Sequence, residues 1–261
     1  MSLIFSISIV IASLSLQKPF IMQLIGRSFN QGGWQSRRGR IFLILFFTHS
    51  LCFAAPITLM LDPAGDVNHA LREIDDVYER GLTLKCAEAI QKKLERENPD
   101  TRVILTRLPG DSLEPLQNAN FANRLAVDCY LTIHFYKETE AKPHCYVYYY
   151  LNNAITDGWK TTTDEFVFIP YDQAHKKNLI TTKIWGNLMI DVLSKMPYTQ
   201  QFDCKGLLGV PHKALVGIQA PAFCVEASLK TKDDWQVYVE PLVHSLLTII
   251  EEIRKSYYAS W

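Results

Sequence analysis

The sequence has no net charge, and its first fifth has no acidic residue. The 261 residues include 27 Lys and Arg and 27 Asp and Glu, but residues 1–54 contain five basic residues and none of the acidic ones. The rest of the chain is therefore net acidic. Proteins that bind nucleic acid along its phosphate backbone carry clustered positive charge. The charge distribution thus argues against nucleic acid as the main partner.

Cysteine is too sparse for a disulfide framework. Five cysteines follow residue 54, an odd number at irregular spacing, whereas disulfide-rich domains have even, patterned sets. Cys129 and Cys224 lie within apolar runs, where a free cysteine packs as a small hydrophobic residue. A single disulfide formed after export stays compatible with the sequence, which does not select the pair.

Internal repeats and low-complexity linkers are also missing, and nothing indicates a second folded domain. One apolar stretch runs from Leu3 to Leu16, and another lies at 41–47. The run at 41–47 is too short to span a bilayer comfortably. It follows Arg37-Arg38-Gly39-Arg40 and precedes Cys52-Phe53-Ala54, an order typical of a secretory signal peptide. We therefore predict an N-terminal extension and signal peptide over 1–54, with cleavage after Ala54. The alternative is an anchor that stays attached to the membrane.

Apolar runs alternate with helical periodicity in the body of the chain. Runs at 57–61, 102–106 and 128–134 predict strands, and hydrophobic residues recur at helical spacing over 74–97 and 115–126. This order predicts parallel strands joined by right-handed crossovers. Further strands are predicted at 145–151, 165–169 and 223–226, and further helices at 174–193 and 235–257. The expected fold class is α/β, a single domain with a mostly parallel twisted sheet flanked by helices on both faces.

Polar residues lie at or near the ends of these apolar runs. Glu73 follows the first run, His134 ends the middle run, and Glu226 ends a late one. Ligands of open α/β sheets bind at the carboxyl ends of the strands. The three side chains are therefore expected to be neighbours in space. The remaining histidines of the body with no such context, His144, His175, His212 and His244, are predicted to be structural or exposed.

Five short motifs follow one another in a recognisable order. They are Leu61-Asp-Pro-Ala-Gly-Asp66, Arg72-Glu73, Leu105-Thr-Arg107 with the helix after it, Thr132-Ile-His134, and Pro221-Ala-Phe-Cys-Val-Glu226. Together they resemble the zinc-dependent N-acetylmuramoyl-L-alanine amidases of the bacterial cell wall, in the amidase 3 family. The resemblance runs from about Ile57 to the C-terminus, which makes 55–261 an amidase-like catalytic domain.

The resemblance implies a zinc site with one departure from the family pattern. Glu73 and His134 match two zinc ligands of the family, and Glu226 matches its catalytic glutamate. The family's first zinc-binding histidine is missing, because Gly65 stands at that position. Catalytic zinc usually has three protein ligands and a water. The nearby Asp66 is the preferred replacement, ahead of His69, which lies further along the loop.

What the resemblance implies about function is an exported peptidoglycan hydrolase. It would cleave the amide between N-acetylmuramic acid and the L-alanine of the stem peptide, in the periplasm or elsewhere in the cell envelope. The resemblance is also compatible with an activator protein as a second partner besides peptidoglycan. The missing histidine favours an alternative, a non-catalytic relative that binds cell wall or regulates a partner. A zinc hydrolase acting on another amide is a third hypothesis, and Glu73 could also simply complement a helix dipole.

Overall fold

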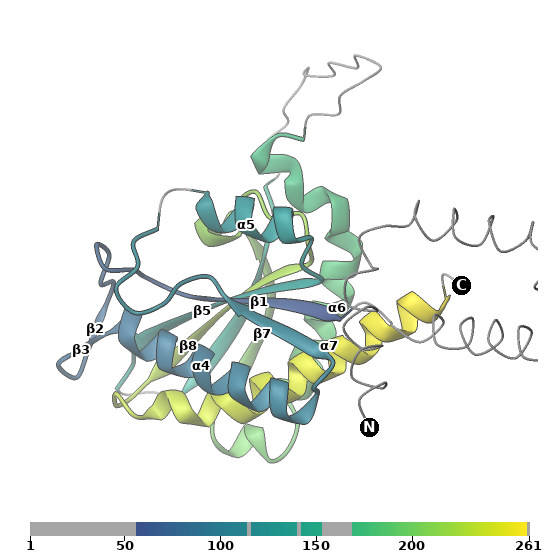
Figure 1. The fold of residues 1–261 in the computed structure, drawn as a ribbon. Helices are drawn as coiled ribbons and strands as arrows, with labels where there is room; N and C mark the ends of the chain where they lie inside the picture. Colours follow the sequence, from purple (N-terminus) through teal and green to yellow (C-terminus); the bar gives the residue numbers. More distant parts are fainter. Residues whose placement is uncertain (1–55, 114–115, 140–141, 153–168, 260–261) are drawn as a thin grey trace, which may run out of the picture. The chain divides into compact units, whose positions relative to one another are not determined.

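A six-stranded sheet organises the computed structural model, which describes residues 56–113, 116–139, 142–152 and 169–259 (Figure 1). The strand order is β4-β1-β5-β8-β6-β7. The first four of these strands are parallel, β6 is antiparallel to β8, and β7 is parallel to β6. The mostly parallel sheet predicted from the sequence is therefore confirmed. The strands are β1 (Ile57–Pro63), β4 (Thr101–Leu105), β5 (Cys129–Lys137), β6 (His144–Tyr150), β7 (Asp203–Val210) and β8 (Ala222–Leu229).

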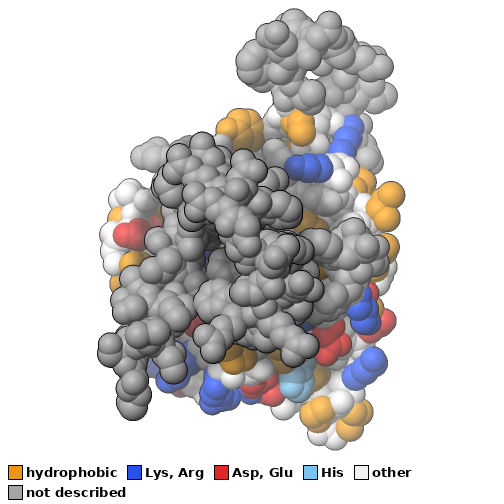
Figure 2. Space-filling view, turned by 45° about the vertical axis from the view of Figure 1, so that its right-hand side comes forward, with side chains coloured by type: hydrophobic (Ala, Val, Ile, Leu, Met, Phe, Trp, Pro, Cys, Tyr) orange, Lys and Arg blue, Asp and Glu red, His pale blue; other side chains and the backbone are white. Residues whose placement is uncertain are grey.

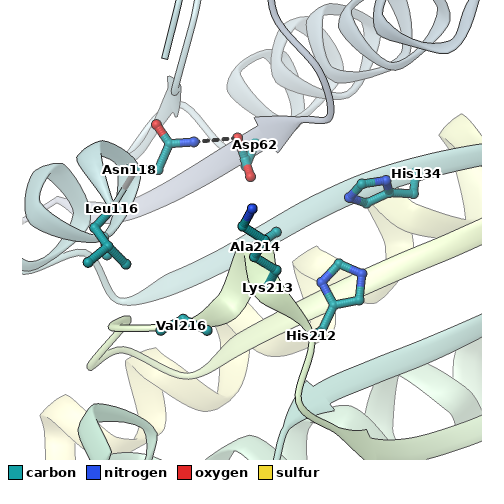
Figure 3. Close-up of a pocket in the computed structure, with 9 residues that line it drawn as sticks. Asp62, Leu116, Asn118, His134, His212, Lys213, Ala214 and Val216 are labelled. Carbon is teal, nitrogen blue, oxygen red and sulfur yellow. Dashed lines mark hydrogen bonds between the residues drawn. The ribbon is translucent and has the colours of Figure 1, made fainter. Parts of the chain in front are cut away.

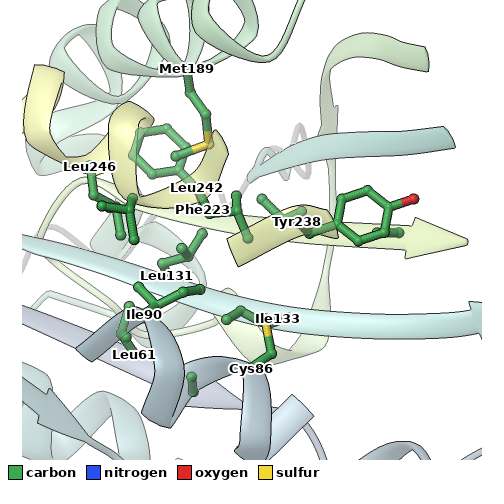
Figure 4. Packing of buried hydrophobic residues seen from close by; sticks show 14 of the residues in the cluster. Leu61, Cys86, Ile90, Leu131, Ile133, Met189, Phe223, Tyr238, Leu242 and Leu246 are labelled. Carbon is green, nitrogen blue, oxygen red and sulfur yellow. The ribbon is translucent and has the colours of Figure 1, made fainter. Parts of the chain in front are cut away.

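Helices cover both faces of the sheet, as predicted. On one face lie α4 (Glu79–Glu97), α6 (Leu179–Leu193) and α7 (Val239–Ala259), and on the other lies α5 (Gln117–Leu125). The larger core forms on the three-helix face, where Leu131 and Phe223 of the sheet pack between α4 and α7 (Figure 4). Successive side chains along a strand point to opposite faces of the sheet, so they pack alternately into the larger and the smaller core. The neighbours of Leu131 and Phe223 along their strands therefore point to the face covered by α5.

The first helix begins later than the sequence periodicity indicates. Residues Glu73–Ile74 (β2) and Val77–Tyr78 (β3) pair as an antiparallel hairpin. Asp75 and Asp76 form its turn with φ angles of 47° and 64°, the left-handed conformation that a two-residue hairpin turn needs. The helix prediction over 74–97 is thus wrong at its start. Helix α4 begins at Glu79, and this shift decides which glutamate reaches the site.

Helix α6 buries a face other than the one on which Ile180 and Ile184 recur at helical spacing. A 3₁₀ helix, Tyr171–Asn178, precedes it, and Ile180 and Ile184 are 77% and 54% exposed. The buried side is centred on Gly186, where an added Cβ would lie 2.7 Å from a methyl of Leu207. This close approach to β7, a strand that the sequence did not reveal, sets the orientation of the helix.

Within the described residues, further 3₁₀ segments lie at Tyr198–Gln200, Lys213–Leu215 and Asp234–Tyr238. On the face drawn in Figure 2, exposed hydrophobic side chains lie among Lys, Arg, Asp and Glu side chains. No helix in the described part of the chain is both long enough and apolar enough to cross a bilayer. The predicted signal segment, and residues 165–168 of the predicted strand at 165–169, lie outside the described residues.

Candidate active site

The sheet brings His134 and Glu226 side by side near the carboxyl ends of two parallel strands. Their Cα atoms are register partners on β5 and β8, and Asp62 near the end of β1 pairs with Thr132 one strand away. Because side chains alternate between faces, His134 lies on the same face as Thr132. That face is the one covered by α5. The sequence prediction that His134 and Glu226 are neighbours agrees with this register.

Glu79 fixes the orientation of the His134 ring. This first residue of α4 is only 1% exposed, and its Oε1 accepts a hydrogen bond from the Phe135 amide at 3.0 Å and lies 3.1 Å from His134 Nδ1. Nε2 of His134 is buried and has no hydrogen-bond partner. Histidines that bind metals commonly donate their second ring nitrogen to a carboxylate in this way. His134 is therefore arranged as a ligand that would bind through Nε2.

Glu73, the glutamate singled out by the sequence, lies elsewhere. It is exposed on the hairpin strand β2 and pairs with Tyr78. The structure therefore brings Glu79, not Glu73, to His134. Glu79 lies inside the stretch 74–97 that the sequence predicts as helical, and no motif marks it as the start of the helix. The Asp75-Asp76 turn that separates the two glutamates was not recognised.

Asp66 and His69 are engaged within their own loop. Oδ1 of Asp66 accepts hydrogen bonds from the amides of Asn68 and His69, and Oδ2 accepts one from the amide of Leu113. Burial would raise the pKa of Asp66, but these bonds and the His69 ring hold it below its usual value. His69 is 71% exposed at its side chain. Neither residue belongs to the metal-binding group found among the described residues.

The loop conformation also leaves no room for a side chain at Gly65, the position of the missing histidine. Gly65 has a φ of +78°, and an added Cβ would lie 2.8 Å from Arg80 Cβ and 2.8 Å from the carbonyl oxygen of His69. Buried Arg107 holds this loop in place by donating to the carbonyls of Pro63 and Ala64. A side chain at position 65 thus meets both a strained φ angle and a close contact.

We expect Gly65→His to destabilise the protein and not to rebuild the family's site. Backbone strain and overpacking together should lower the free energy of unfolding by about 1–3 kcal/mol. Gly110→His is the matched control, because Gly110 has a φ of +90° but no atom within 4 Å of an added Cβ. Thermal or urea unfolding of both variants measures the difference. Equal stability of the two, or tighter metal binding by Gly65→His, would contradict this reading of the loop.

Glu226 is held by two donors. Nη1 of Arg72 donates to Oε1 at 2.7 Å and also to the Phe135 carbonyl at 3.3 Å, while the Tyr148 hydroxyl donates to Oε2 at 3.2 Å. Burial and the negative charge of Glu226 raise the pKa of Tyr148, so that its hydroxyl stays a donor. The carboxylate therefore has a fixed orientation beside His134.

A cavity of about 300 Å³ opens beside His134 (Figure 3). At its edge, Oδ1 of Asp62 accepts hydrogen bonds from Thr106 at 2.7 Å and Asn118 at 2.9 Å. These bonds connect the end of β1 to the residue after β4 and to α5. The remaining lining comes from the start of α5 and from the segment after β7. The lining residues are Asp62, Leu116, Asn118, Ala119, His134, His212, Lys213, Ala214 and Val216.

His212 is the site residue that sequence reasoning missed. It follows β7 and lines the same cavity as His134, and the centroids of the two rings are 5.3 Å apart. Its Nε2 is 3.5 Å from Cys224 Sγ on β8. Among the described residues, His134, His212 and Cys224 form a group that could hold a metal ion, with one ligand atom from each within 4.8 Å of the others. Burial lowers the pKa of His212, and nearby His134 lowers it further, so the imidazole is neutral and has a free lone pair.

Comparison with known proteins identifies the family of the chain. Residues 62–239 match the Amidase_3 family, described as N-acetylmuramoyl-L-alanine amidase. No curated protein matches the chain by sequence.

Solved structures share the fold at low identity. The catalytic domain of CwlV, an N-acetylmuramoyl-L-alanine amidase from Bacillus (Paenibacillus) polymyxa var. colistinus, is 16% identical with a TM-score of 0.55, covering 75% of this chain and 98% of that one. An N-acetylmuramoyl-L-alanine amidase from Clostridium difficile 630 is 18% identical with a TM-score of 0.52, covering 76% and 98%. The CwlD amidase from Clostridioides difficile, solved in complex with the GerS lipoprotein, is 12% identical with a TM-score of 0.52, covering 75% and 98%. Because the family match spans more than half of the chain, this protein belongs to the Amidase_3 family of N-acetylmuramoyl-L-alanine amidases.

Proposed function

We propose that this protein is an exported, zinc-dependent peptidoglycan amidase that hydrolyses the bond between N-acetylmuramic acid and the L-alanine of the stem peptide. The observation that supports it best is the pairing of His134 with Glu226 beside the cavity, with His134 oriented by buried Glu79. An imidazole with a free Nε2 can bind a metal ion, and an adjacent carboxylate can act as the general base for metal-bound water. Membership of the family supplies the substrate class.

The residues of the site divide the chemistry among them. A bound zinc ion would supply Lewis-acid polarisation of the amide carbonyl and a lowered pKa for water. His134 would hold the ion through Nε2, and Glu79 would keep the ring in place. Glu226 would take a proton from the attacking water and pass it to the leaving amine of L-alanine. Arg72 would hold the other oxygen of Glu226 and limit its rotation.

Purified sacculi provide the test of this reaction. We expect the zinc-loaded protein to release stem peptides that carry a new N-terminal L-alanine, and to leave the glycan strands uncut. Chelator-treated protein should release none, and zinc added back should restore the release. New sugar reducing ends, or cleavage within the stem peptide, would contradict the proposed bond. Binding to sacculi without any release would favour the non-catalytic relative that the missing histidine at Gly65 suggests.

Export forms a separate part of the proposal. A basic segment, a short apolar run and small residues precede Ala55, and the proposed substrate lies outside the cytoplasmic membrane. We expect the mature protein to begin near Ala55, as N-terminal sequencing of the envelope fraction would reveal. Recovery of the intact chain from the cytoplasm alone would argue against export. The amidase solved with a lipoprotein makes an envelope activator a partner to seek in the same fraction.

A further inference from the structure

The residues around His134 include donors that the family pattern does not contain. Cys224 lies two residues before Glu226 on β8, so both side chains lie on the same face of the strand. His212 approaches from the segment that follows β7, and its ring stacks on Tyr148, with an interplanar angle of 16°. These two residues therefore reach His134 from two elements that are distant from the Gly65 loop. Neither was expected at the site from the sequence.

The spacing of these donors matches a tetrahedral metal site. Zinc–sulfur bonds of about 2.3 Å and zinc–nitrogen bonds of about 2.0–2.1 Å place the two ligand atoms about 3.6 Å apart in a tetrahedron. The observed separation of Cys224 Sγ and His212 Nε2 is 3.5 Å. With His134 included, one ligand atom from each of the three residues lies within 4.8 Å of the others. The Cys224–His212 pair thus already has the tetrahedral separation, and His134 lies close enough to join it by side-chain rotation.

Two buried ring nitrogens at the site lack any partner. They are Nε2 of His134 and Nδ1 of His212, and the Nε2 of His212 meets only the weakly polar thiol of Cys224. A buried polar group without a hydrogen bond costs about 1–3 kcal/mol. A metal ion bound to Nε2 of His134 would give that buried nitrogen a partner, and Nε2 of His212, which faces Cys224, could bind the same ion. Nδ1 of His212 would then carry the ring proton and would not bind the ion.

We propose that His134, His212 and Cys224 are the protein ligands of the metal ion, and that His212 and Cys224 replace two family ligands: the histidine absent at Gly65 and the glutamate matched to Glu73. This inference rests on the proposed metal-dependent function and specifies its metal centre. Three protein ligands leave the fourth tetrahedral position for water or substrate, as in catalytic zinc sites. His134 and His212 both line the cavity, so that position faces the space available to substrate. Glu226, the register partner of His134 on the neighbouring strand β8, then lies within the same site.

A thiolate ligand has a consequence for metal preference. Burial and the negative charges of Glu226 and Asp62 keep the pKa of the Cys224 thiol above its usual value, whereas a metal-bound thiol is deprotonated outright. Thiolate and imidazole ligands favour zinc and chemically similar ions over magnesium, calcium and manganese. Cobalt(II) can therefore replace zinc at this centre, and a thiolate bound to cobalt has a charge-transfer absorption band in the near ultraviolet.

Cobalt(II) substitution of the mature protein tests the ligand set without measuring activity. We expect one cobalt ion per chain and a thiolate-to-cobalt charge-transfer band. Cys224→Ser should abolish the band and weaken metal binding at least about tenfold, and His212→Ala should weaken binding by a similar factor. Cys129→Ser is the matched control, because Cys129 is an equally buried free cysteine packed in the core on the opposite face, and its band should be unchanged. Circular dichroism of each variant checks the fold.

The outcomes separate this inference from the proposed function. Stoichiometric cobalt without the band, or a band that survives in Cys224→Ser, would overturn the ligand set while leaving metal-dependent cleavage of sacculi in place. Unchanged cobalt affinity in His212→Ala would likewise remove His212 from the set. Failure of the wild-type protein to bind cobalt or zinc would overturn the ligand set as well, and the sacculus digestion would then decide the proposed function independently.

Discussion

Replacing Glu226 with glutamine is expected to lower the rate of amide cleavage by about 10²–10⁴-fold. Glutamine keeps the size of the side chain, and its single amide oxygen can still accept the hydrogen bond from Arg72. Its NH2 group would face the Tyr148 hydroxyl as a donor, and the side chain cannot take a proton from water. The variant should therefore keep its metal content and its affinity for peptidoglycan. Release of stem peptides from sacculi, measured together with zinc content in one preparation, provides both numbers.

Glu88→Gln is a suitable control for this variant. Glu88 is exposed on α4, and the substitution removes the same charge at a surface position away from the site. Its activity should equal that of the wild type. Unchanged turnover in Glu226→Gln would refute the assigned role. Loss of zinc together with activity would instead mean that Glu226 helps to hold the ion.

Replacing Glu79 with alanine is expected to weaken metal binding by about 10–100-fold. The change removes the carboxylate that orients His134, and it leaves the buried amide of Phe135 without its acceptor. Such an unsatisfied group should also lower the free energy of unfolding by about 1–3 kcal/mol. Metal titration and urea unfolding measure the two effects separately.

Glu73→Ala is the matched control, and it decides between the two glutamates of the hairpin region. Glu73 is exposed on β2 and has no contact with His134 in the structure. We expect the variant to bind metal as the wild type does and to unfold at the same urea concentration. If Glu73→Ala loses metal and Glu79→Ala does not, the motif match to Glu73 was right and the geometry of Glu79 has no role in metal binding.

The parallel part of the sheet could be predicted because its signals are local. The apolar runs that became β1, β5 and β8 are largely buried, and buried parallel strands appear in a sequence as continuous hydrophobic stretches. The run of β4, at the edge of the sheet, is only partly buried. β7 was missed because only part of it is apolar and its residues are half-buried or exposed, with Gly206 and Gly209 interrupting the run. The face of α6 was missed because Gly186 packs on β7, a tertiary contact without a periodic signal.

The candidate site was predicted only where a motif and a strand end coincide. His134 and Glu226 end apolar runs, so sequence alone brought them together. Glu79 depended on locating a two-residue turn at Asp75-Asp76, whose left-handed φ angles favour Asn and Gly more than Asp. His212 had no motif, since its place beside Cys224 depends on how the segment after β7 folds over the sheet. Distances of this kind across a cavity have no counterpart in sequence spacing.

Anomalous diffraction from crystals of the zinc-loaded mature protein would locate the ion directly. We expect a single strong peak at the zinc edge, about 2.0–2.1 Å from a ring nitrogen of His134 and of His212 and about 2.3 Å from Cys224 Sγ, on the cavity side next to Glu226. A peak in the loop of Asp66 and His69, or no ordered zinc in crystals of protein that cleaves sacculi, would contradict the metal centre proposed for this chain.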